Sequence, residues 1–489
     1  MKKLKPIMFV GTGSDVGKSI INTALCRIFL QDGYQPAPFK AQNMSLNSYA
    51  TPDGLEIGRA QAVQAEACGL ECEVEMNPVL LKPTGDQNSQ VVLHGKPIGN
   101  QSAKEYFLND NKSNLFKEVL VAFKKLEQKY NPVVLEGAGS ISELNLRSRD
   151  IVNMPMAKAV GACTYLVADI DRGGVFASVY GSIKLLPEDE RKLIKGVLIN
   201  KFRGDIDLFT EGRKILEDIT GVPVIGVIPY FKGITIEEED SVSLLKMNKT
   251  AVQDKVNVAV VPLRHMSNFT DFNRFAEVDD VNLYFTDSVQ ELSKTDILII
   301  PGSKNTISDM NYLEETGLAQ YLKDWHQSGK NIYGICGGYQ IMGEEIFDPM
   351  HIESKADSVK GLGILPVVTV ISNEKNSTQT SFKYLDKTDG CEGYEIHMGE
   401  TSFLTQQKPV AHLSNGVKDG YYKSEKAWGT YIHGIFDNAV VLKDVLEPFL
   451  NKKLEIGNYK EFKNKEYDKL ADFVRANLNM DQIYKDLEG

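Results

Sequence analysis

The chain has 489 residues, which is too long for one hydrophobic core and predicts two to four domains, with two preferred. With 42% hydrophobic and 25% charged residues, its composition is that of an ordinary globular protein. The net charge of −11 argues against nucleic acid or an anionic membrane surface as a partner. No apolar stretch reaches the roughly 18 residues that a membrane span needs.

The amino terminus and the cysteines indicate an intracellular protein. Residues 1–6 lead directly into an apolar strand and leave no room for a secretory leader. The six cysteines are scattered without a CxxC pair, so neither a disulfide framework nor a zinc ribbon is expected. We therefore expect a cytoplasmic protein without nucleic-acid or membrane partners, and the sequence leaves its oligomeric state open.

The amino-terminal segment predicts a strand, a phosphate-binding loop and a helix. Apolar residues 7–10 precede the loop, and residues 20–30 follow it with helical apolar spacing. In such a loop the backbone N–H groups converge on phosphate oxygens, Lys18 reaches the terminal phosphates and Ser19 offers a hydroxyl to Mg²⁺. The loop is one residue longer than the common pattern, and a chance Gly-Lys-Ser after a strand is the alternative. The candidate ATP-binding residues are Gly11, Thr12, Gly13, Ser14, Asp15, Val16, Gly17, Lys18 and Ser19.

Three further residues of the first half are candidates for the same site. Lys40 stands at the end of the next predicted strand, close to where ligands gather in a doubly wound sheet. Glu56 begins a predicted helix over 56–66 and is either a Mg²⁺ ligand or a carboxylate that complements the helix dipole. Glu136 ends a buried strand before a glycine turn, where P-loop enzymes keep a metal-side carboxylate, and is the better candidate.

Strands and helices alternate through the rest of the first half and then begin again. Strands predicted at 164–169, 196–200 and 221–229 complete a mostly parallel, doubly wound sheet with helices on both faces. Residues 234–255 are acidic and weakly periodic, as expected of a linker. A second α/β series then opens at residue 256 and includes strands at 296–303 and 331–336.

Cys336 is the sharpest single residue of the second half. An apolar strand leads into Gly334-Ile-Cys-Gly-Gly338 and then a helix, which is the pattern of a nucleophile elbow. A helix amino terminus lowers a thiol pKa, whereas a buried structural cysteine is the alternative. His433, before a glycine at the end of a short strand, is the preferred base, and His397 is the second choice. In Pro301-Gly302-Ser303, the N–H groups of Gly302 and Ser303 could complete an oxyanion hole.

A phosphate-loop ATPase and a cysteine acyl-transfer site in one chain suggest ATP-driven amidation with ammonia from glutamine. The chain from about residue 5 to 440 resembles the cobyric acid synthases, glutamine-dependent amidotransferases of cobalamin biosynthesis. Its first half is similar to dethiobiotin synthetase, whose phosphate loop has the same extra residue, and its second half to class I glutamine amidotransferases. The stretches that carry the resemblance are 11–19, 40–48, 136–139, 267–272, 301–306 and 393–399.

The resemblance implies a substrate and roles for the candidate residues. The substrate would be adenosylcobyrinic acid a,c-diamide, a corrinoid, amidated at its b, d, e and g side chains with ATP, Mg²⁺ and glutamine. Ser19, Glu56 and Glu136 match positions of Mg²⁺ ligands, Cys336 the nucleophile and His433 its base. Most class I members carry a glutamate two residues after the histidine, where this chain has Ile435. The group that orients His433 therefore stays open.

The expected domains are 1–233, a P-loop synthetase domain, and 256–445, a glutamine amidotransferase-like domain, with a linker at 234–255 and a helical tail at 446–489. Three other functions stay open at this point. Cobyrinic acid a,c-diamide synthase has similar halves, although the Gln42-Asn43 loop argues against it. A ParA-like ATPase switch with a vestigial second domain is another candidate, but it would give Cys336 and His433 no catalytic role. A cell-wall amidotransferase would normally split the halves between subunits.

Overall fold

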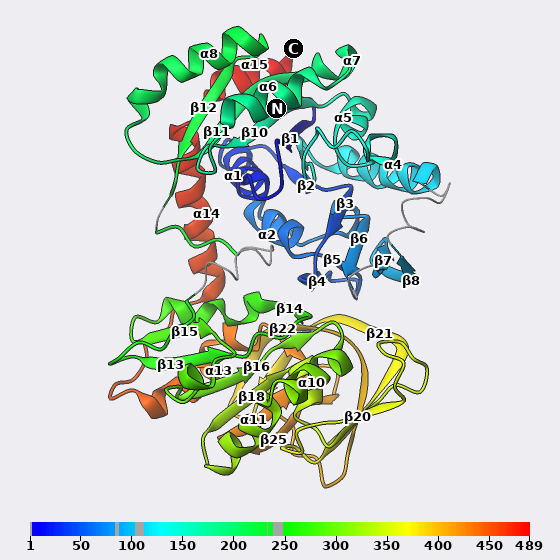
Figure 1. Ribbon diagram of the computed structural model, residues 1–489, viewed down its shortest axis with the longest axis vertical. Helices are drawn as coiled ribbons and strands as arrows, with labels where there is room; N and C mark the ends of the chain where they lie inside the picture. The colour runs from blue at the N-terminus through cyan, green and yellow to red at the C-terminus, as the bar shows by residue number, and fades with distance from the viewer. Residues whose placement is uncertain (1, 84–87, 103–111, 232, 238–247) are drawn as a thin grey trace.

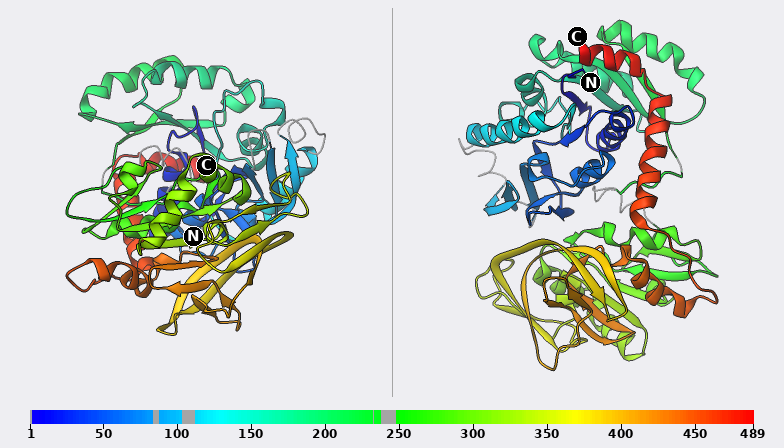
Figure 2. Two further views of the ribbon diagram at one scale, coloured as in Figure 1. Left: turned by 60° about the horizontal axis from the view of Figure 1, so that its bottom comes forward. Right: turned by 180° about the vertical axis from the view of Figure 1, so that it is seen from behind.

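The computed structural model describes residues 2–83, 88–102, 112–231, 233–237 and 248–489. Two α/β bodies follow one another along the chain, the first in blue to green and the second in green to orange in Figure 1. A long carboxy-terminal helix runs from the second body back to the first (Figures 1 and 2). Residues 238–247 of the predicted linker lie outside the described residues. Among the helices described, none is long and apolar enough to cross a membrane.

The first body is built on a parallel sheet with strand order β12-β11-β10-β1-β9-β2. Its strands are β1 (Ile7–Gly11), β2 (Ala37–Phe39), β9 (Val133–Glu136), β10 (Cys163–Asp169), β11 (Ile194–Phe202) and β12 (Val224–Pro229). The helices of this part are α1 (Lys18–Gln31), α2 (Arg59–Ala67), α4 (Lys112–Lys129), α5 (Met154–Val160), α6 (Val175–Lys184), α7 (Glu188–Arg191) and α8 (Thr210–Thr220). The predicted doubly wound sheet is confirmed.

Successive residues of β1 enter different cores, which explains why this strand reads as a continuous apolar run. Ile7 and Phe9 pack in the core under α1, whereas Met8 and Val10 pack in the core under α4 and α6. Side chains of a strand alternate between its two faces, so a sheet covered on both sides needs apolar residues at every position. The phosphate loop leaves the carboxyl end of this central strand.

Small strands between β2 and β9 extend the first body toward the second. They are β3 (Gln42–Met44), β4 (Ser48–Ala50), β5 (Glu56–Gly58), β6 (Val79–Pro83), β7 (Asn88–Leu93) and β8 (Lys96–Ser102). The helix predicted from residue 56 begins only at Arg59, because Glu56 pairs with Ala50 in the antiparallel β4–β5 ladder. Gly58 still has extended dihedral angles before α2 begins. Long-range pairing here overrides the local helix preference.

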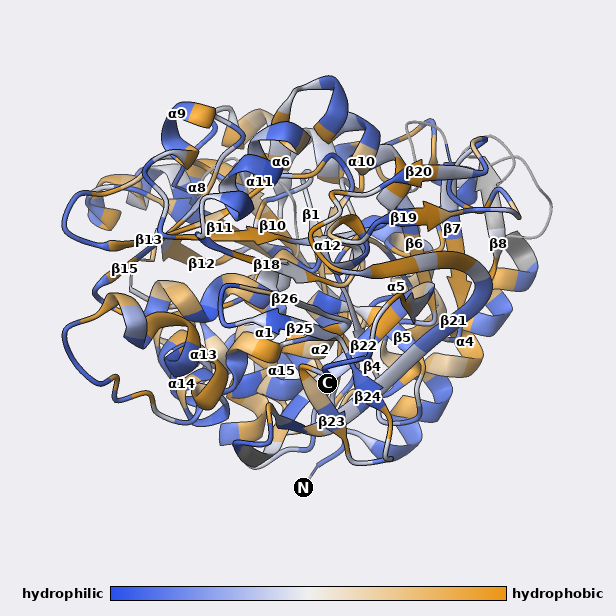
Figure 3. Ribbon diagram, turned by 90° about the horizontal axis from the view of Figure 1, so that it is seen from below, coloured by the Kyte–Doolittle hydropathy of each residue, from blue (hydrophilic) through white to orange (hydrophobic). Residues whose placement is uncertain are grey.

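The second body has a sheet of order β15-β13-β16-β18-β26-β25, parallel except for the last pair. Its strands are β13 (Val256–Val260), β15 (Val281–Phe285), β16 (Ile297–Ile300), β18 (Asn331–Ile335), β25 (Tyr421–Ser424) and β26 (Ala427–Thr430). Its helices are α9 (Val289–Leu292), α10 (Thr306–Glu315), α11 (Leu318–Gln327), α12 (Gly337–Ile341) and α13 (Ala439–Leu446). In Figure 3, α11 is coloured largely as hydrophilic. The predicted second α/β unit is confirmed.

A second, mostly antiparallel sheet covers one side of this body and reaches the first. It contains β19 (Glu345–Phe347), β20 (Ser358–Lys360), β21 (Val367–Tyr384), β22 (Thr388–Phe403), β23 (Ala411–Leu413), β24 (Lys418–Asp419) and β27 (Ile432–His433). A short ladder joins β14 (Met266–Ser267) to β17 (Gly302–Ser303). The long hairpin of β21 and β22 meets β4 of the first body, where Gln379 Nε2 donates to the Ala50 carbonyl at 3.0 Å.

The carboxy-terminal helices α14 (Tyr459–Ala476) and α15 (Met480–Glu488) pack on the first body, against α1. Leu470, Val474 and Leu478 belong to the same core as the inner residues of α1. Two ion pairs flank this contact, Arg27 with Asp468 at 2.7 Å and Arg475 with Asp32 at 2.9 Å. The end of the chain is therefore part of the first body's core.

Candidate functional site

The phosphate loop has the backbone that its glycines allow. Gly17 has φ of 98° and caps α1, and a Cβ there would lie 2.1 Å from Nδ2 of Asn200. Asp15 also has a positive φ, 56°, and its carboxylate pairs with Arg172 at 2.7 Å. Asn200 fixes the loop from β11 by donating to the Val16 carbonyl at 2.9 Å. The loop is thus held open at the amino end of α1, where N–H groups can meet phosphate oxygens.

Lys18 lies over this loop and links it to the turn after β9. Its Nζ donates to the Gly13 carbonyl at 2.8 Å and to the Gly139 carbonyl at 3.1 Å. From this place, the Lys18 ammonium group could exchange its two carbonyl partners for the terminal phosphates when a nucleotide binds. A Cβ on Gly11 would come within 2.9 Å of this ammonium nitrogen.

Glu136 brings two of the other candidate residues, Ser19 and Lys40, together with Gln64 at the carboxyl end of β9. Its Oε1 accepts from Ser19 Oγ at 2.8 Å and from Lys40 Nζ at 2.8 Å, and its Oε2 accepts from Gln64 Nε2 at 2.6 Å. Burial opposes its charged form, but Lys40 and the hydrogen bonds outweigh burial and lower the pKa of Glu136. A serine hydroxyl beside an ionised carboxylate is a donor set that suits Mg²⁺.

Glu56 does not lie with Ser19 and Glu136 at the end of β9. It is fully buried and pairs with Lys82, at 2.6 Å, and with Lys375 of β21. The two ammonium groups outweigh the cost of burial and lower the pKa of Glu56. It is also absent from the residues that line the cavity at the phosphate loop. The arrangement joins the two bodies of the chain through a buried carboxylate with two cationic partners.

A cavity of about 950 Å³ opens from the phosphate loop toward the second body. Lys18, Lys40 and Glu136 line one end, and Met266 and Phe269 of the second body line the other. Neutral polar residues at positions 42, 43, 45 and 47 also line the cavity. The cavity therefore combines charged groups suited to phosphates with a lining of amide, hydroxyl and apolar groups, the last including Met44 and Phe231.

Cys336 forms the turn between β18 and α12. Its φ of 51° and ψ of −109° are unusual for a side-chain-bearing residue, which is the strain expected of a nucleophile elbow. Its neighbours must be small, because a Cβ on Gly338 would lie 2.0 Å from the Ile300 carbonyl oxygen. A Cβ on Gly337 would lie 2.6 Å from the backbone nitrogen of Ser303. The N–H groups after Cys336 and at β17 thus border the same turn.

His433 is held between Cys336 and an aspartate. Its Nδ1 lies 2.7 Å from Oδ2 of Asp271, whose Oδ1 accepts from the Gly434 N–H at 3.0 Å. Burial alone would lower the pKa of His433, but Asp271 and then Cys336 outweigh burial and raise it to about 10. Asp271 therefore stabilises a positively charged ring beside the Cys336 sulfur.

The sequence did not predict Asp271 as the acid of this site. It lies 162 residues before His433 in the chain, on the 3₁₀-helix η5 (Phe269–Glu277). The sequence feature that could have indicated it is an aspartate within the motif 267–272, between Phe269 and Phe272, which are both buried. His397, the second choice as base, donates from Nδ1 to the Gly399 carbonyl at 2.9 Å, and its ring stacks on Tyr431. Burial lowers the pKa of His397 to about 4.

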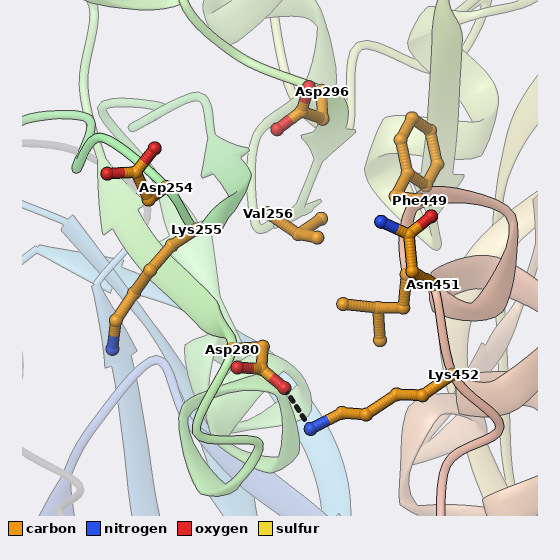
Figure 4. Close-up of a pocket in the computed structure, with 9 residues that line it drawn as sticks. Asp254, Lys255, Val256, Asp280, Asp296, Phe449, Asn451 and Lys452 are labelled. Atoms are coloured by element: carbon orange, nitrogen blue, oxygen red, sulfur yellow. Dashed lines mark ion pairs between the residues drawn. The ribbon is translucent and has the colours of Figure 1, made fainter.

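Another cavity, of about 520 Å³, lies at the opposite end of the second sheet (Figure 4). It is bordered by Val256, Asp280 and Asp296, which stand at the amino ends of β13, β15 and β16. Asp280 forms an ion pair with Lys452 there. Ligands of parallel sheets bind at the carboxyl ends of the strands, where Cys336 lies, so we do not assign the reaction to this cavity.

Comparison with known proteins adds two family matches. Residues 7–244 match the CobQ/CobB/MinD/ParA nucleotide binding domain, and residues 257–441 match the CobB/CobQ-like glutamine amidotransferase domain. Among curated proteins, a cobyric acid synthase of Bacteroides fragilis is 58% identical over 99% of this chain and 98% of its own length. That of Parabacteroides distasonis is 56% identical over 99% of both chains.

A more distant relative also matches the chain over nearly its full length. The cobyric acid synthase of Streptococcus sanguinis is 47% identical over 99% of this chain and 98% of its own length. Similarity at this level over whole chains covers both the phosphate loop and the cysteine site. The chain therefore belongs to the cobyric acid synthase family and is an ATP-using enzyme of glutamine-dependent amidation.

Proposed function

We propose that the enzyme amidates the b, d, e and g carboxylates of adenosylcobyrinic acid a,c-diamide. The observation that supports this most directly is the cavity that runs from Lys18 and Glu136 to Met266 and Phe269. A corrinoid is larger than a nucleotide, and several peripheral carboxylates must reach one phosphorylation site in turn. A lining that combines apolar side chains with neutral polar groups suits a large ring that carries amides around its edge.

We propose the following roles in the synthetase half. The substrate carboxylate attacks the γ-phosphorus of ATP, giving an acyl phosphate and ADP, and ammonia then displaces phosphate to form the amide. Residues 11–19 bind the ATP phosphates, with Lys18 on the terminal ones, and Lys40 neutralises charge beside them. Ser19 and Glu136 would hold Mg²⁺, which supplies electrostatic stabilisation of the transferring phosphoryl group. Glu56 is assigned to joining the two bodies.

In the glutaminase half, we assign the nucleophile to Cys336. Its thiolate attacks the glutamine carboxamide carbon, and the N–H groups of Gly337 and of Gly302–Ser303 stabilise the oxyanion. The imidazolium of His433 donates its proton to the departing ammonia, and water then releases glutamate from the thioester. Asp271 keeps the ring oriented and stabilises its charge.

This assignment divides the chain into a synthetase domain at 1–233, a linker at 234–255, an amidotransferase domain at 256–445 and a carboxy-terminal helical segment at 446–489. The strands that end at Pro229 and begin again at Val256 support the division. The family matches at 7–244 and 257–441 are compatible with it. Within the last segment, α14 and α15 complete the core of the first domain.

The test is a mass measurement on the corrinoid product. Adenosylcobyrinic acid a,c-diamide is incubated with ATP, Mg²⁺ and glutamine, and the product is followed until amidation stops. We expect up to four successive carboxylate-to-amide changes. No change with this substrate, together with amidation of cobyrinic acid at two positions, would favour the a,c-diamide synthase instead. Omission of ATP is the control and should leave the substrate unchanged.

A further inference from the structure

A short segment of the first domain, Asn47–Ala50, reaches into the surroundings of the glutaminase site. The Phe269 N–H donates to Oδ1 of Asn47 at 3.2 Å, and the Ser48 N–H donates to Oδ1 of Asn268 at 2.9 Å. All of these partners are buried. Two reciprocal hydrogen bonds therefore tie the segment to residues 268–269 of the second domain.

Residues 268–269 begin the turn that carries Asp271. Asn268 has φ of 53° and ψ of 41°, a left-handed conformation that few residues adopt without support. The Asp271 N–H donates to the Asn268 carbonyl at 3.0 Å, so the carboxylate is only one helical turn beyond the domain contact. The position of Asn268 thus sets where the Asp271 carboxylate meets His433.

A second contact from the same segment reaches the other side of the histidine. The ring of Tyr49 lies 4.6 Å from the ring of Tyr394, centroid to centroid. The Tyr394 ring in turn stacks on the imidazole of His433 at 5.2 Å with an angle of 23° between the planes. Tyr394 and His433 are also paired across β22 and β27, so their rings are neighbours by register.

Tyr49 is itself held from the first domain. The Arg59 guanidinium carbon lies 4.7 Å from the centre of its ring, and Arg59 forms a buried ion pair with Glu237. Glu237 lines the synthetase cavity, as does Asn47. Both routes to His433 therefore start at walls of the cavity in which the acyl phosphate would form.

We propose that Asn47 and Tyr49, residues of the synthetase domain, are positioning residues of the glutaminase site. Asn47 acts through Asn268 and Asp271 on Nδ1 of His433, and Tyr49 acts through Tyr394 on the face of the ring. The glutaminase site is then complete only with both domains in contact. If the acyl phosphate forms in this cavity as proposed above, such contacts would link glutamine hydrolysis to its formation. The positioning of His433 itself is inferred from the contacts alone.

The test compares Tyr49→Ala and Asn47→Ala with wild type in glutamate release from glutamine. A displacement of about 1 Å in a catalytic group can cost about a hundredfold in rate. We expect kcat to fall about 10- to 100-fold while KM for glutamine changes by less than about threefold. Ammonium-driven, ATP-dependent amidation by Tyr49→Ala should stay within about twofold of wild type, since Tyr49 does not line the cavity.

The pH profile separates positioning from a general loss of structure. The groups that face His433 are Asp271, Cys336, Tyr394, Glu395 and His397. With the Asp271 contact disturbed, the high-pH limit of glutaminase activity should move down by one unit or more. Tyr49→Phe keeps the ring that contacts Tyr394, so its glutaminase rate and pH profile should match those of wild type rather than those of Tyr49→Ala. Unchanged kcat and profile in both alanine variants would overturn the proposal.

Lys375→Met is the matched control, because Lys375 also crosses between the domains, to Glu56, without reaching His433. An equal loss of glutaminase rate in this variant would overturn the proposal in favour of domain contact in general. If an alanine variant does not fold, Tyr49→Leu is used with the same readouts. A wild-type enzyme that hydrolyses glutamine but does not amidate the corrinoid would contradict the proposed function and leave this test intact.

Discussion

His433 has two neighbours, Asp271 and Cys336, that favour its protonated form. Asp271 lies 2.7 Å from Nδ1, and together with Cys336 it raises the pKa of His433 to about 10. The imidazolium is therefore present throughout the physiological pH range, and it is lost only as the pH rises through about 10.

We predict that Asp271→Asn lowers glutamine hydrolysis about 10²- to 10⁴-fold, as loss of the orienting carboxylate does in a serine triad. Without the negative charge, the pKa of His433 falls toward its ordinary value, so the high-pH limit of activity moves to lower pH. Glutamate release measured across pH checks both effects. Ammonium-driven amidation is the internal control and should persist.

Glu395→Gln is the matched variant for Asp271→Asn. Glu395 is also a buried acid close to His433, but burial raises the pKa of its carboxyl to about 7, and it accepts a hydrogen bond from Asn376 Nδ2. We expect less than a tenfold loss of glutaminase rate. A greater loss in Glu395→Gln than in Asp271→Asn would contradict the assignment and indicate that Glu395 orients His433.

A second residue-level prediction separates the two carboxylates considered for Mg²⁺. Glu136 receives hydrogen bonds from Ser19 and Lys40, whereas Glu56 pairs with Lys82 and Lys375 at the domain contact. Glu136→Gln should raise the Mg²⁺ concentration for half-maximal ATP hydrolysis at least about tenfold. Glu56→Gln should leave it within about twofold. The opposite ranking would place the metal site at Glu56.

The sequence was sufficient where chemistry depends on neighbouring residues. The phosphate loop and the Cys336 elbow are each encoded within about ten positions, because glycines at fixed offsets permit the backbone. Asp271 could not be found in this way, since its partner is 162 residues away and the two meet only through the fold. The usual acid position holds Ile435, so local spacing gave no substitute.

At the level of elements, strand–helix alternation predicted both sheets because apolar runs and glycine turns are local signals. The start of α2 was predicted three residues too early, since the β4–β5 ladder claims Glu56–Gly58. The carboxy-terminal helices were predicted as a helical tail without a partner. Their amphipathic spacing indicates a buried face, but nothing local says that it packs on α1.

We predict that Leu470→Ala in α14 lowers the free energy of unfolding by about 2–5 kcal/mol, because it removes a fully buried side chain from the core shared with α1. Urea unfolding followed by circular dichroism gives the value. Lys465→Ala on the exposed face of the same helix is the control and should change it by less than about 0.5 kcal/mol. Equal effects would mean that α14 does not contribute to the core in solution.

At the scale of the whole molecule, the two sites share one contact surface. The cavity of the synthetase domain ends at Phe269, and Asp271 lies two residues further along the same turn. The buried Glu56 with Lys82 and Lys375 joins the domains nearby. Domain order was readable from the sequence, whereas this contact was not, because it depends on side chains from distant segments.

The most direct test of this account follows nitrogen through the enzyme. Wild type and Cys336→Ala are each supplied with ATP, the corrinoid acid, glutamine labelled with ¹⁵N at its amide, and an equal concentration of unlabelled ammonium. We predict that wild type places mainly ¹⁵N in the new amides, whereas Cys336→Ala places only unlabelled nitrogen there. Mainly unlabelled amides from wild type, with glutamine hydrolysed at the same time, would contradict coupling between the two sites.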